Sequence, residues 1–336
     1  MTTSSFGAKA SSAISVGRRR SRSLFGGYSG RGPVIFLYGL IVAIVIAAGF
    51  WSPAFWSEDN LIDLLRSSIV VGLVAIGQMI VVITGGIDFS IGVTAAFVGV
   101  VAAKLFGVFN GNIIIVVVLA LGVGLGIGLI NGLLVGPRNA SPFIITFGMY
   151  FVLTGMTLVV SATPVSGVPD RYLNLYDATL GDRLPWCILG MTALWIVAWL
   201  VMNRTRFGRA LYAIGGSQSS ARLAGIDVRL TLLGAYGMCG LFGAAAGMFI
   251  LARSGVADVT ANGLEFAAIV AVAVGGVSLF GGVGSVVGVL GGVLLLTIIR
   301  NLLIIGNVSE FYQQLVTGGI ILIAVATFKQ QRVGRL

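Results

Sequence analysis

The amino-acid sequence predicts an all-α protein that crosses a membrane about ten times. Of its 336 residues, 57% are hydrophobic and only 10% are charged, and the mean hydropathy is +1.04. Soluble domains contain about 25% charged and about 45–50% apolar residues. The apolar residues form successive runs of about 20, the length of a membrane-spanning helix, whereas a barrel would show short alternating strands.

The first expected span covers residues 34–50. An Arg- and Ser-rich segment precedes it, as in a signal sequence. However, the apolar run is long, lacks a small-residue cleavage site and ends at Trp51 and Trp56, which suit a membrane interface. We therefore interpret it as a span. The remaining spans are expected at residues 64–84, 89–106, 112–135, 142–161, 185–202, 228–252, 264–280, 283–303 and 311–328.

A break interrupts the apolar sequence after the second expected span. Residues 77–92, GQMIVVITGGIDFSIG, contain two adjacent glycines followed by an acidic residue, Asp88. Hydrocarbon offers no partner for a charge or a freed backbone group, so the break is expected to face protein or a polar cavity. Asp88 and Ser90 lie where the third span begins. Their oxygens are expected either to cap that helix or to line a polar route.

Polar side chains at membrane depth are the candidate substrate-pathway residues. Glu265 lies at the predicted outer end of the eighth span, where the favoured interpretation is a solvated first-turn acid that interacts with the helix dipole. The candidates are Gln78, Thr84, Asp88, Ser90, Asn131 and Glu265.

Glycines indicate close helix packing. Gly124, Gly128 and Gly132 recur every four residues and predict a small-residue face, which we expect to pack within the subunit, with dimerisation as the alternative. Residues 80–89, IVVITGGIDF, also have a weak echo at residues 270–279, VAVAVGGVSL. Transporters are often built from repeated halves with matching broken helices, so this echo points to a second glycine cluster.

The distribution of charge predicts the orientation of the chain in the membrane. Most basic residues lie in the tail 1–32, the loop 203–227 and the tail 329–336, which fall on one side if ten spans are drawn. The positive-inside rule assigns this side, with both termini, to the cytoplasm. The net charge of +10 therefore reflects topology and proximity to anionic lipid, and no nucleic-acid partner is expected. Residues 33–328 are expected to form one transmembrane domain.

The composition argues against a soluble-type hydrolase or an ATPase. The chain has no histidine, which removes the Ser-His-Asp triad and the HExxH zinc site. It also lacks the GxxxxGK[ST] phosphate loop. Cys187 and Cys239 lie in apolar segments without metal or redox spacing. We therefore expect no catalytic residue, metal or cofactor in this chain.

The longest inner loop contains an ordered element. Residues 205–228 read TRFGRALYAIGGSQSSARLAGIDV, and Ser217 to Ala224 within them predict a short amphipathic helix. Ser217 is the expected N-cap and Gly225 the expected stop. Such a helix suggests a docking surface, with a solvated basic anchor as the alternative.

Four glycine-rich segments, taken in order, resemble the sugar-type permease family of bacterial ABC importers, the membrane subunits of ribose, xylose, arabinose and galactoside uptake systems. The likeness extends over roughly residues 60–328. The segments are 77–92, SPFIITFGMYFVLTG at 141–155, 205–228, and AAIVAVAVGGVSLFGGVGSVVG at 267–288.

The resemblance implies a multi-pass transport subunit of the bacterial inner membrane that imports a monosaccharide or a related polyol. Its implied partners are an ABC-type ATPase subunit that holds ATP and Mg, a second permease copy or homologue, and a periplasmic sugar-binding protein. Residues 205–228 would contain the coupling helix that contacts the ATPase. The implied coupling residues are Gly208, Tyr212, Gly215, Gly216, Ala221, Gly225 and Ile226. Ser217, Phe89 and Ile91 depart from the family's usual Asn, Leu and Val.

Three alternatives remain open from the sequence. The first is a permease for another small solute, such as a branched-chain amino acid. The second is a secondary transporter coupled to protons or sodium, with Asp88 and Glu265 as its titrating pair. The third is a membrane-embedded structural or assembly subunit without a transport route.

Overall fold

The computed structural model describes residues 32–138, 140–181, 184–258 and 263–309, together with a few positions between 311 and 322. The expected basic tail therefore lies almost entirely outside the described residues, as does the C-terminal tail, and most of the expected span at 311–328 does too. The described elements are α1 (Gly32–Trp51), η1 (Pro53–Trp56), α2 (Glu58–Ile83), α3 (Ile91–Val108), α4 (Ile113–Arg138), α5 (Pro142–Val160), α6 (Asp170–Asp177), β1 (Thr179–Leu180), β2 (Leu184–Pro185), α7 (Trp186–Arg204), α8 (Arg206–Gly216), α9 (Gln218–Leu223), α10 (Val228–Ser254), α11 (Leu264–Val274) and α12 (Val286–Ile305).

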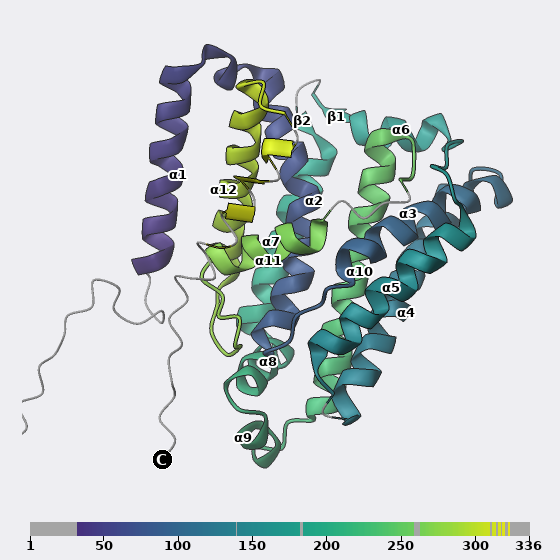
Figure 1. Cartoon of the computed structure of the whole chain (residues 1–336), viewed down its shortest axis with the longest axis vertical. Coiled ribbons are helices and arrows are strands. Elements are labelled where there is room, and N and C mark those ends of the chain that lie inside the picture. The colour runs from purple at the N-terminus through teal and green to yellow at the C-terminus, as the bar shows by residue number, and fades with distance from the viewer. Residues whose placement is uncertain are drawn as a thin grey trace, which may run out of the picture.

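The architecture is an all-α bundle, as predicted. Among the described residues, eight helices are long and apolar enough to cross a membrane: α1, α2, α3, α4, α5, α7, α10 and α12. They run roughly along the long axis of the molecule (Figure 1), and α8 and α9 lie at the opposite end from α6. Strands β1 and β2 pair antiparallel over two residues each, between α6 and α7.

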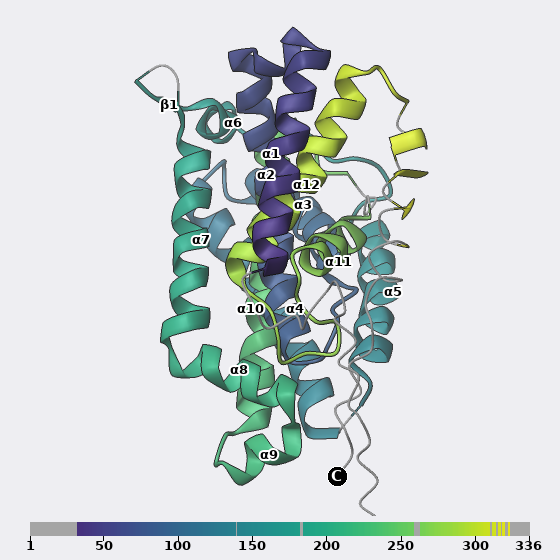
Figure 2. The ribbon, with the colours of Figure 1, turned by 90° about the vertical axis from the view of Figure 1, so that its left-hand side faces the viewer.

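The central helices are α2, α3 and α10. In their apolar windows, 78% of α2 and 67% of each of the other two is buried, whereas only 17% of α1 and of α5 is buried. Figure 2 shows α1 and α7 on the outside of the bundle. The peripheral helices therefore present apolar surface outwards, as expected of a protein surrounded by lipid or by a second subunit.

Close packing between α4 and α10 depends on glycine. A Cβ atom at Gly124 would overlap the Gly240 carbonyl oxygen, and one at Gly128 would overlap that of Tyr236. The expected small-residue face thus packs inside the subunit, where it allows two backbones to approach.

The expected span at residues 264–280 is wrong in length. Helix α11 ends at Val274, because Gly275 and Gly276 follow it and Gly276 adopts a φ of +81°. Gly281 and Gly282 also have positive φ values, +88° and +75°, so the chain up to α12 is irregular. At 11 residues, α11 is too short to cross a bilayer. The chain therefore has a second break after α11, in addition to the break after α2.

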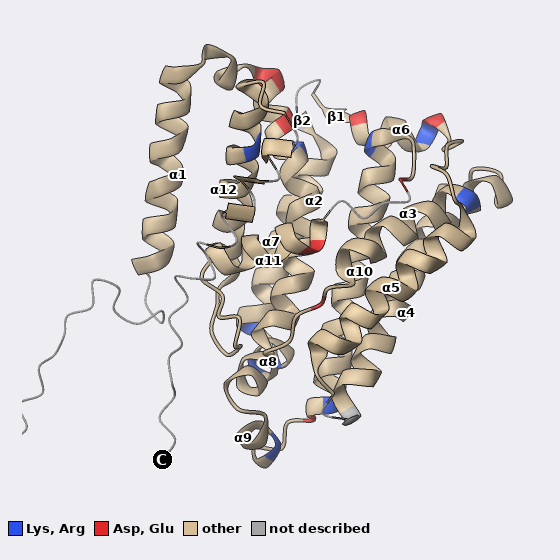
Figure 3. Cartoon of the chain, in the orientation of Figure 1, with Lys and Arg blue, Asp and Glu red and all other residues tan. Residues whose placement is uncertain are grey.

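Charged residues gather at the two ends of the bundle (Figure 3). The α8–α9 end carries the basic loop residues Arg204, Arg206, Arg209 and Arg222. At the other end, Arg66 of α2 forms an ion pair with Asp177 of α6 at 3.6 Å and stacks over the ring of Tyr176. The apolar middle between these ends is the part that a bilayer would surround.

Candidate functional site

The break between α2 and α3 is held by a buried polar cluster. The Asp88 carboxyl oxygen accepts the backbone N–H of Ser90 at 2.8 Å and the Ser90 hydroxyl at 2.6 Å. The Asn131 side-chain amide of α4 donates to the same hydroxyl at 2.9 Å. None of the three residues is more than 1% exposed. Ser90 makes no side-chain cap bond, so the expectation that its oxygen caps α3 is wrong: the hydroxyl instead donates to the stronger acceptor, Asp88.

Helices α2 and α10 complete this cluster. In the orientation that pairs donors with acceptors, the Gln78 amide donates to the Asp88 backbone carbonyl at 2.9 Å and accepts the Asp88 N–H at 3.2 Å. The Cys239 side chain of α10 lies close to the Asp88 carboxyl group. We call Gln78, Asp88, Ser90, Asn131 and Cys239 the Asp88 cluster. It joins the break to three helices and is closed off from open space by protein.

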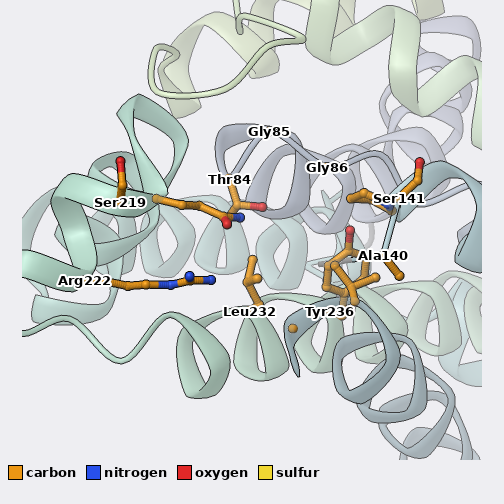
Figure 4. Close-up of a pocket in the computed structure, with 13 residues that line it drawn as sticks. Thr84, Gly85, Gly86, Ala140, Ser141, Ser219, Arg222, Leu232 and Tyr236 are labelled. Atoms are coloured by element: carbon orange, nitrogen blue, oxygen red, sulfur yellow. The ribbon is translucent and has the colours of Figure 1, made fainter. Parts of the chain in front are cut away.

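Thr84 lies outside the Asp88 cluster, at a pocket near the α9 end. Its hydroxyl donates to the Val81 carbonyl at 2.7 Å. The pocket has a volume of about 460 Å³ and opens between the break, the α4–α5 connection, α9 and α10 (Figure 4). Its lining residues are Thr84, Gly85, Gly86, Val135, Gly136, Ala140, Ser141, Pro142, Gln218, Ser219, Arg222, Leu232 and Tyr236.

Glu265 is buried and separate from the Asp88 cluster. It lies in the first turn of α11 and is 1% exposed, so the expectation of a solvated acid is wrong. The reason is tertiary: α11 packs against α3, and a Cβ atom at Gly92 would overlap the Glu265 carboxyl oxygen Oε2. Within the described residues, no hydrogen bond joins Glu265 to the Asp88 cluster.

Sequence reasoning missed an aromatic cluster beside the break. The Phe89 ring lies 5.2 Å from that of Phe143, 6.1 Å from that of Phe147 and 6.2 Å from that of Phe266, all edge-to-face. These rings come from the break, α5 and α11. The spacing of Phe143, Phe147 and Phe151 on one face of a predicted helix was the available signal.

The inner loop folds as two short helices with the expected signals. The Thr205 hydroxyl caps α8 by accepting the Gly208 N–H at 3.1 Å. The Ser217 hydroxyl caps α9 by accepting the Ser220 N–H at 3.2 Å, and Gly225 follows α9 with a φ of +80°. The predicted cap and stop are therefore confirmed.

Several expected coupling residues face the interior of the subunit. A Cβ atom at Gly208 would overlap the Met202 carbonyl oxygen, and Ala221 is buried. The Tyr212 hydroxyl donates to the Gly284 carbonyl at 3.1 Å, and burial raises the pKa of this hydroxyl. By contrast, Gly216 and Gly225 are exposed, and Ile226 is half-buried.

Gly215 belongs to a junction between three segments that are far apart in the sequence. A Cβ atom there would overlap both the Ile83 carbonyl oxygen and the Gly282 nitrogen. The Gly282 N–H donates to the Ile83 carbonyl at 2.9 Å, and Gly281 lies against Gly85. We call Gly85, Gly215, Gly281 and Gly282 the glycine junction. It connects the end of α8 to the breaks after α2 and after α11.

Leu223 is the most exposed large apolar residue of the α8–α9 segment, at 90% exposed. It ends α9, opposite the buried Ala221 face. Sequence reasoning overlooked it, although an apolar residue on the polar face of an amphipathic helix is a signal for a partner surface.

Together, the long apolar helices, the two breaks and the helix pair at the basic end define a multi-pass membrane protein. The family model described as "Branched-chain amino acid transport system / permease component" matches residues 60–325, and the chain belongs to this permease family. No solved structure matches the chain significantly.

Three relatives of this chain are named for sugars. The ribose import permease protein RbsC of Escherichia coli (strain K12) is 36% identical, over 86% of this chain and 91% of that protein. The galactose/methyl galactoside import permease protein MglC of the same strain is 34% identical, over 89% and 94%. The D-allose transport system permease protein AlsC, also of this strain, is 34% identical, over 87% and 89%.

Proposed function

We propose that this chain is the transmembrane permease subunit of an ATP-driven importer for a monosaccharide or a related small polyol. The likeness to ribose, galactose and allose permeases supports the substrate class, because it covers about nine-tenths of each relative. The structural observation that carries the mechanism is the glycine junction, through which α8 contacts the breaks after α2 and after α11.

The proposed mechanism begins at α9. An ATPase subunit, which holds ATP and Mg, binds the α9 end through Leu223 and the neighbouring polar residues. Displacement of α9 moves α8, and the glycine junction passes this movement to the breaks after α2 and α11. Such coupling requires two global states to which the nucleotide-bound partner binds with different affinity. The α9 end then faces the cytoplasm, with both termini on that side of a bacterial inner membrane.

The remaining partners follow from the same proposal. A periplasmic sugar-binding protein delivers the substrate at the α6 end, and a second permease, identical or homologous, completes the route. Of the candidate pathway residues, we assign Thr84 to the route, because it lines an open pocket. Gln78, Asp88, Ser90 and Asn131 shape the wall by holding the break, and none of them is among the described residues that line the pocket.

The structure gives less support to a secondary transporter. Its proposed titrating pair would be Asp88 and Glu265, but Asp88 is engaged by the Asp88 cluster and Glu265 lies outside it. A branched-chain amino acid is disfavoured by the sugar-specific names of the relatives.

The test is uptake by proteoliposomes that contain this chain with its ATPase and its sugar-binding protein. We expect ATP on the α9 side to drive uptake of radiolabelled ribose, galactose or allose, and an uncoupler to have no effect. A nonhydrolysable ATP analogue serves as the control. Uptake of leucine in place of these sugars would refute the substrate class. Sugar uptake that survives removal of the ATPase and collapses with an uncoupler would instead establish a secondary transporter.

A further inference from the structure

The pocket at the α9 end has the chemistry of a small-molecule site. Its volume of about 460 Å³ falls within the roughly 300–1,000 Å³ range of ligand pockets. Three separate parts of the chain line it: the break after α2, the α4–α5 connection, and the α9–α10 region. Figure 4 shows the Arg222 side chain extended along the pocket towards Leu232 and Thr84. A ligand there would therefore touch both the proposed coupling helix and the break.

A buried hydroxyl at this pocket lacks a partner. Tyr236 of α10 lines the pocket and is 0% exposed, and its hydroxyl makes no hydrogen bond within the described residues. The hydroxyl lies against Gly86, where a Cβ atom would overlap it. An unpaired buried hydroxyl costs about 1–3 kcal/mol. A ligand hydroxyl placed in the pocket would remove that cost.

The pocket lining contains both hydrogen-bond donors and hydrogen-bond acceptors. Ser141 is the N-cap of α5 but makes no side-chain cap bond, so the positive end of α5 faces the pocket. Thr84 closes the carbonyl end of α2, and Gly136 lies in the last turn of α4, so two negative helix ends face it as well. The Gln218 amide contributes one donor group and one acceptor.

This mixture selects a neutral ligand. An inorganic anion would be attracted by the Arg222 guanidinium and the α5 end but repelled by the two carbonyl ends, and a cation would be repelled by Arg222. An amino acid would find no carboxylate for its ammonium group among the described residues that line the pocket. A polyol both donates and accepts at every hydroxyl and carries no charge that must be balanced. Leu232 and Pro142 provide apolar surface for its C–H groups.

We propose that this pocket binds a neutral polyol of monosaccharide size on the α9 side of the membrane, with the Tyr236 hydroxyl as one of its hydrogen-bond partners. The identity of the polyol as the transported sugar rests on the proposed function. The site is distinct from the Asp88 cluster, which is closed to solvent.

Cysteine protection tests the site in the full-length permease, purified in detergent without its ATPase so that α9 is not covered. Ser219 lines the pocket, whereas Ser220, its exposed neighbour on α9, does not. Ser219→Cys and Ser220→Cys variants are labelled with a maleimide in the presence of ribose, galactose or allose. By mass action, a sugar at ten times its dissociation constant should slow labelling at position 219 about tenfold. Labelling at position 220 should not change.

A second substitution tests the role of the tyrosine. Tyr236→Phe, made in the Ser219→Cys variant, removes only a hydroxyl that has no protein partner among the described residues, so the fold should persist. We expect it to weaken protection about threefold to tenfold, the effect of losing one hydrogen bond. Tyr312→Phe, at an exposed tyrosine outside the pocket, is the matched control and should leave protection unchanged.

The outcomes separate this proposal from the proposed function. Absence of protection by all three sugars, or equal protection with Tyr236→Phe, overturns the site. Protection by leucine or inorganic phosphate but not by sugars overturns the polyol assignment. Sugar uptake without protection refutes the site and leaves the proposed function intact. Protection without sugar uptake refutes the proposed function and leaves the site intact.

Discussion

Asp88 is a buried carboxyl group whose environment explains how it is tolerated inside an apolar bundle. An isolated charge at membrane depth costs at least about 2.5–3.5 kcal/mol. Hydrogen bonds to a charged group each contribute about 1.5–3 kcal/mol. The two bonds from Ser90 to the carboxyl group are of the same order as this minimum cost, and the bonds from Gln78 hold the neighbouring backbone. Asp88 thus holds an irregular backbone in place.

Substitution of Asp88 should reveal this structural role. Asp88→Ala leaves the Ser90 N–H and hydroxyl without their acceptor, and each orphaned group costs about 1–3 kcal/mol. Asp88→Asn keeps one acceptor oxygen and should therefore destabilise the fold less than Asp88→Ala. Thermal unfolding in detergent should therefore show a lower Tm for Asp88→Ala than for Asp88→Asn. Wild-type Tm for both variants with loss of uptake would show that Asp88 contacts the substrate instead.

Helix α8 contacts the two breaks. Gly215, in the last turn of α8, lies where the backbones of α2 and the α11–α12 connection meet the helix, and no side chain fits there. Tyr212 adds a side-chain bond from α8 to the same connection. The family resemblance identified these positions as coupling residues. The structure shows that they contact the membrane core of the same chain, whereas Leu223 points away from it.

Two adjacent glycines of α8 provide a matched test of the glycine junction. Gly215→Ala places a methyl group against backbone atoms that cannot rotate away, and such overpacking costs about 1–3 kcal/mol. Gly216→Ala meets nothing within 4 Å. We expect Gly215→Ala to reduce uptake per ATP hydrolysed in proteoliposomes and Gly216→Ala to retain it. Identical coupling ratios for the two variants would contradict a role of the junction in coupling.

The bundle as a whole presents different surfaces at its two ends and along its sides. The sides are apolar, and α1 and α5 are mostly unburied within the chain. The α9 end is basic and exposes Leu223, whereas the α6 end carries acidic residues and the ion pair of Arg66 with Asp177. A partner that hydrolyses ATP is therefore expected at the α9 end.

Exposed leucines at opposite ends test the location of that partner. Leu223→Asp should abolish copurification of the ATPase without lowering Tm, because the side chain is 90% exposed and leaves no cavity. Leu175→Asp, at a 54% exposed position of α6, should leave copurification unchanged. Retention of the ATPase by Leu223→Asp, or its loss from Leu175→Asp, would place the contact elsewhere.

Sequence alone predicts the membrane class, most spans, the break at Gly85 and Gly86, and the cap and stop of α9. These features depend on composition, on periodicity or on residues a few positions apart, so the local sequence contains the required information. Helix α2 ends within one residue of its expected span and differs mainly at its start, where the Ser57 cap precedes the charged turn of Glu58 and Asp59.

Tertiary structure decides the features that join distant segments. Glu265 is buried because α11 packs on α3, and α11 is a half-length helix because the glycines after it turn the chain. The Asp88 cluster, the glycine junction and the pocket at Tyr236 each combine residues separated by tens to hundreds of positions. Hydropathy and helix signals identify the elements, but the contacts between elements arise only when their surfaces pack against one another.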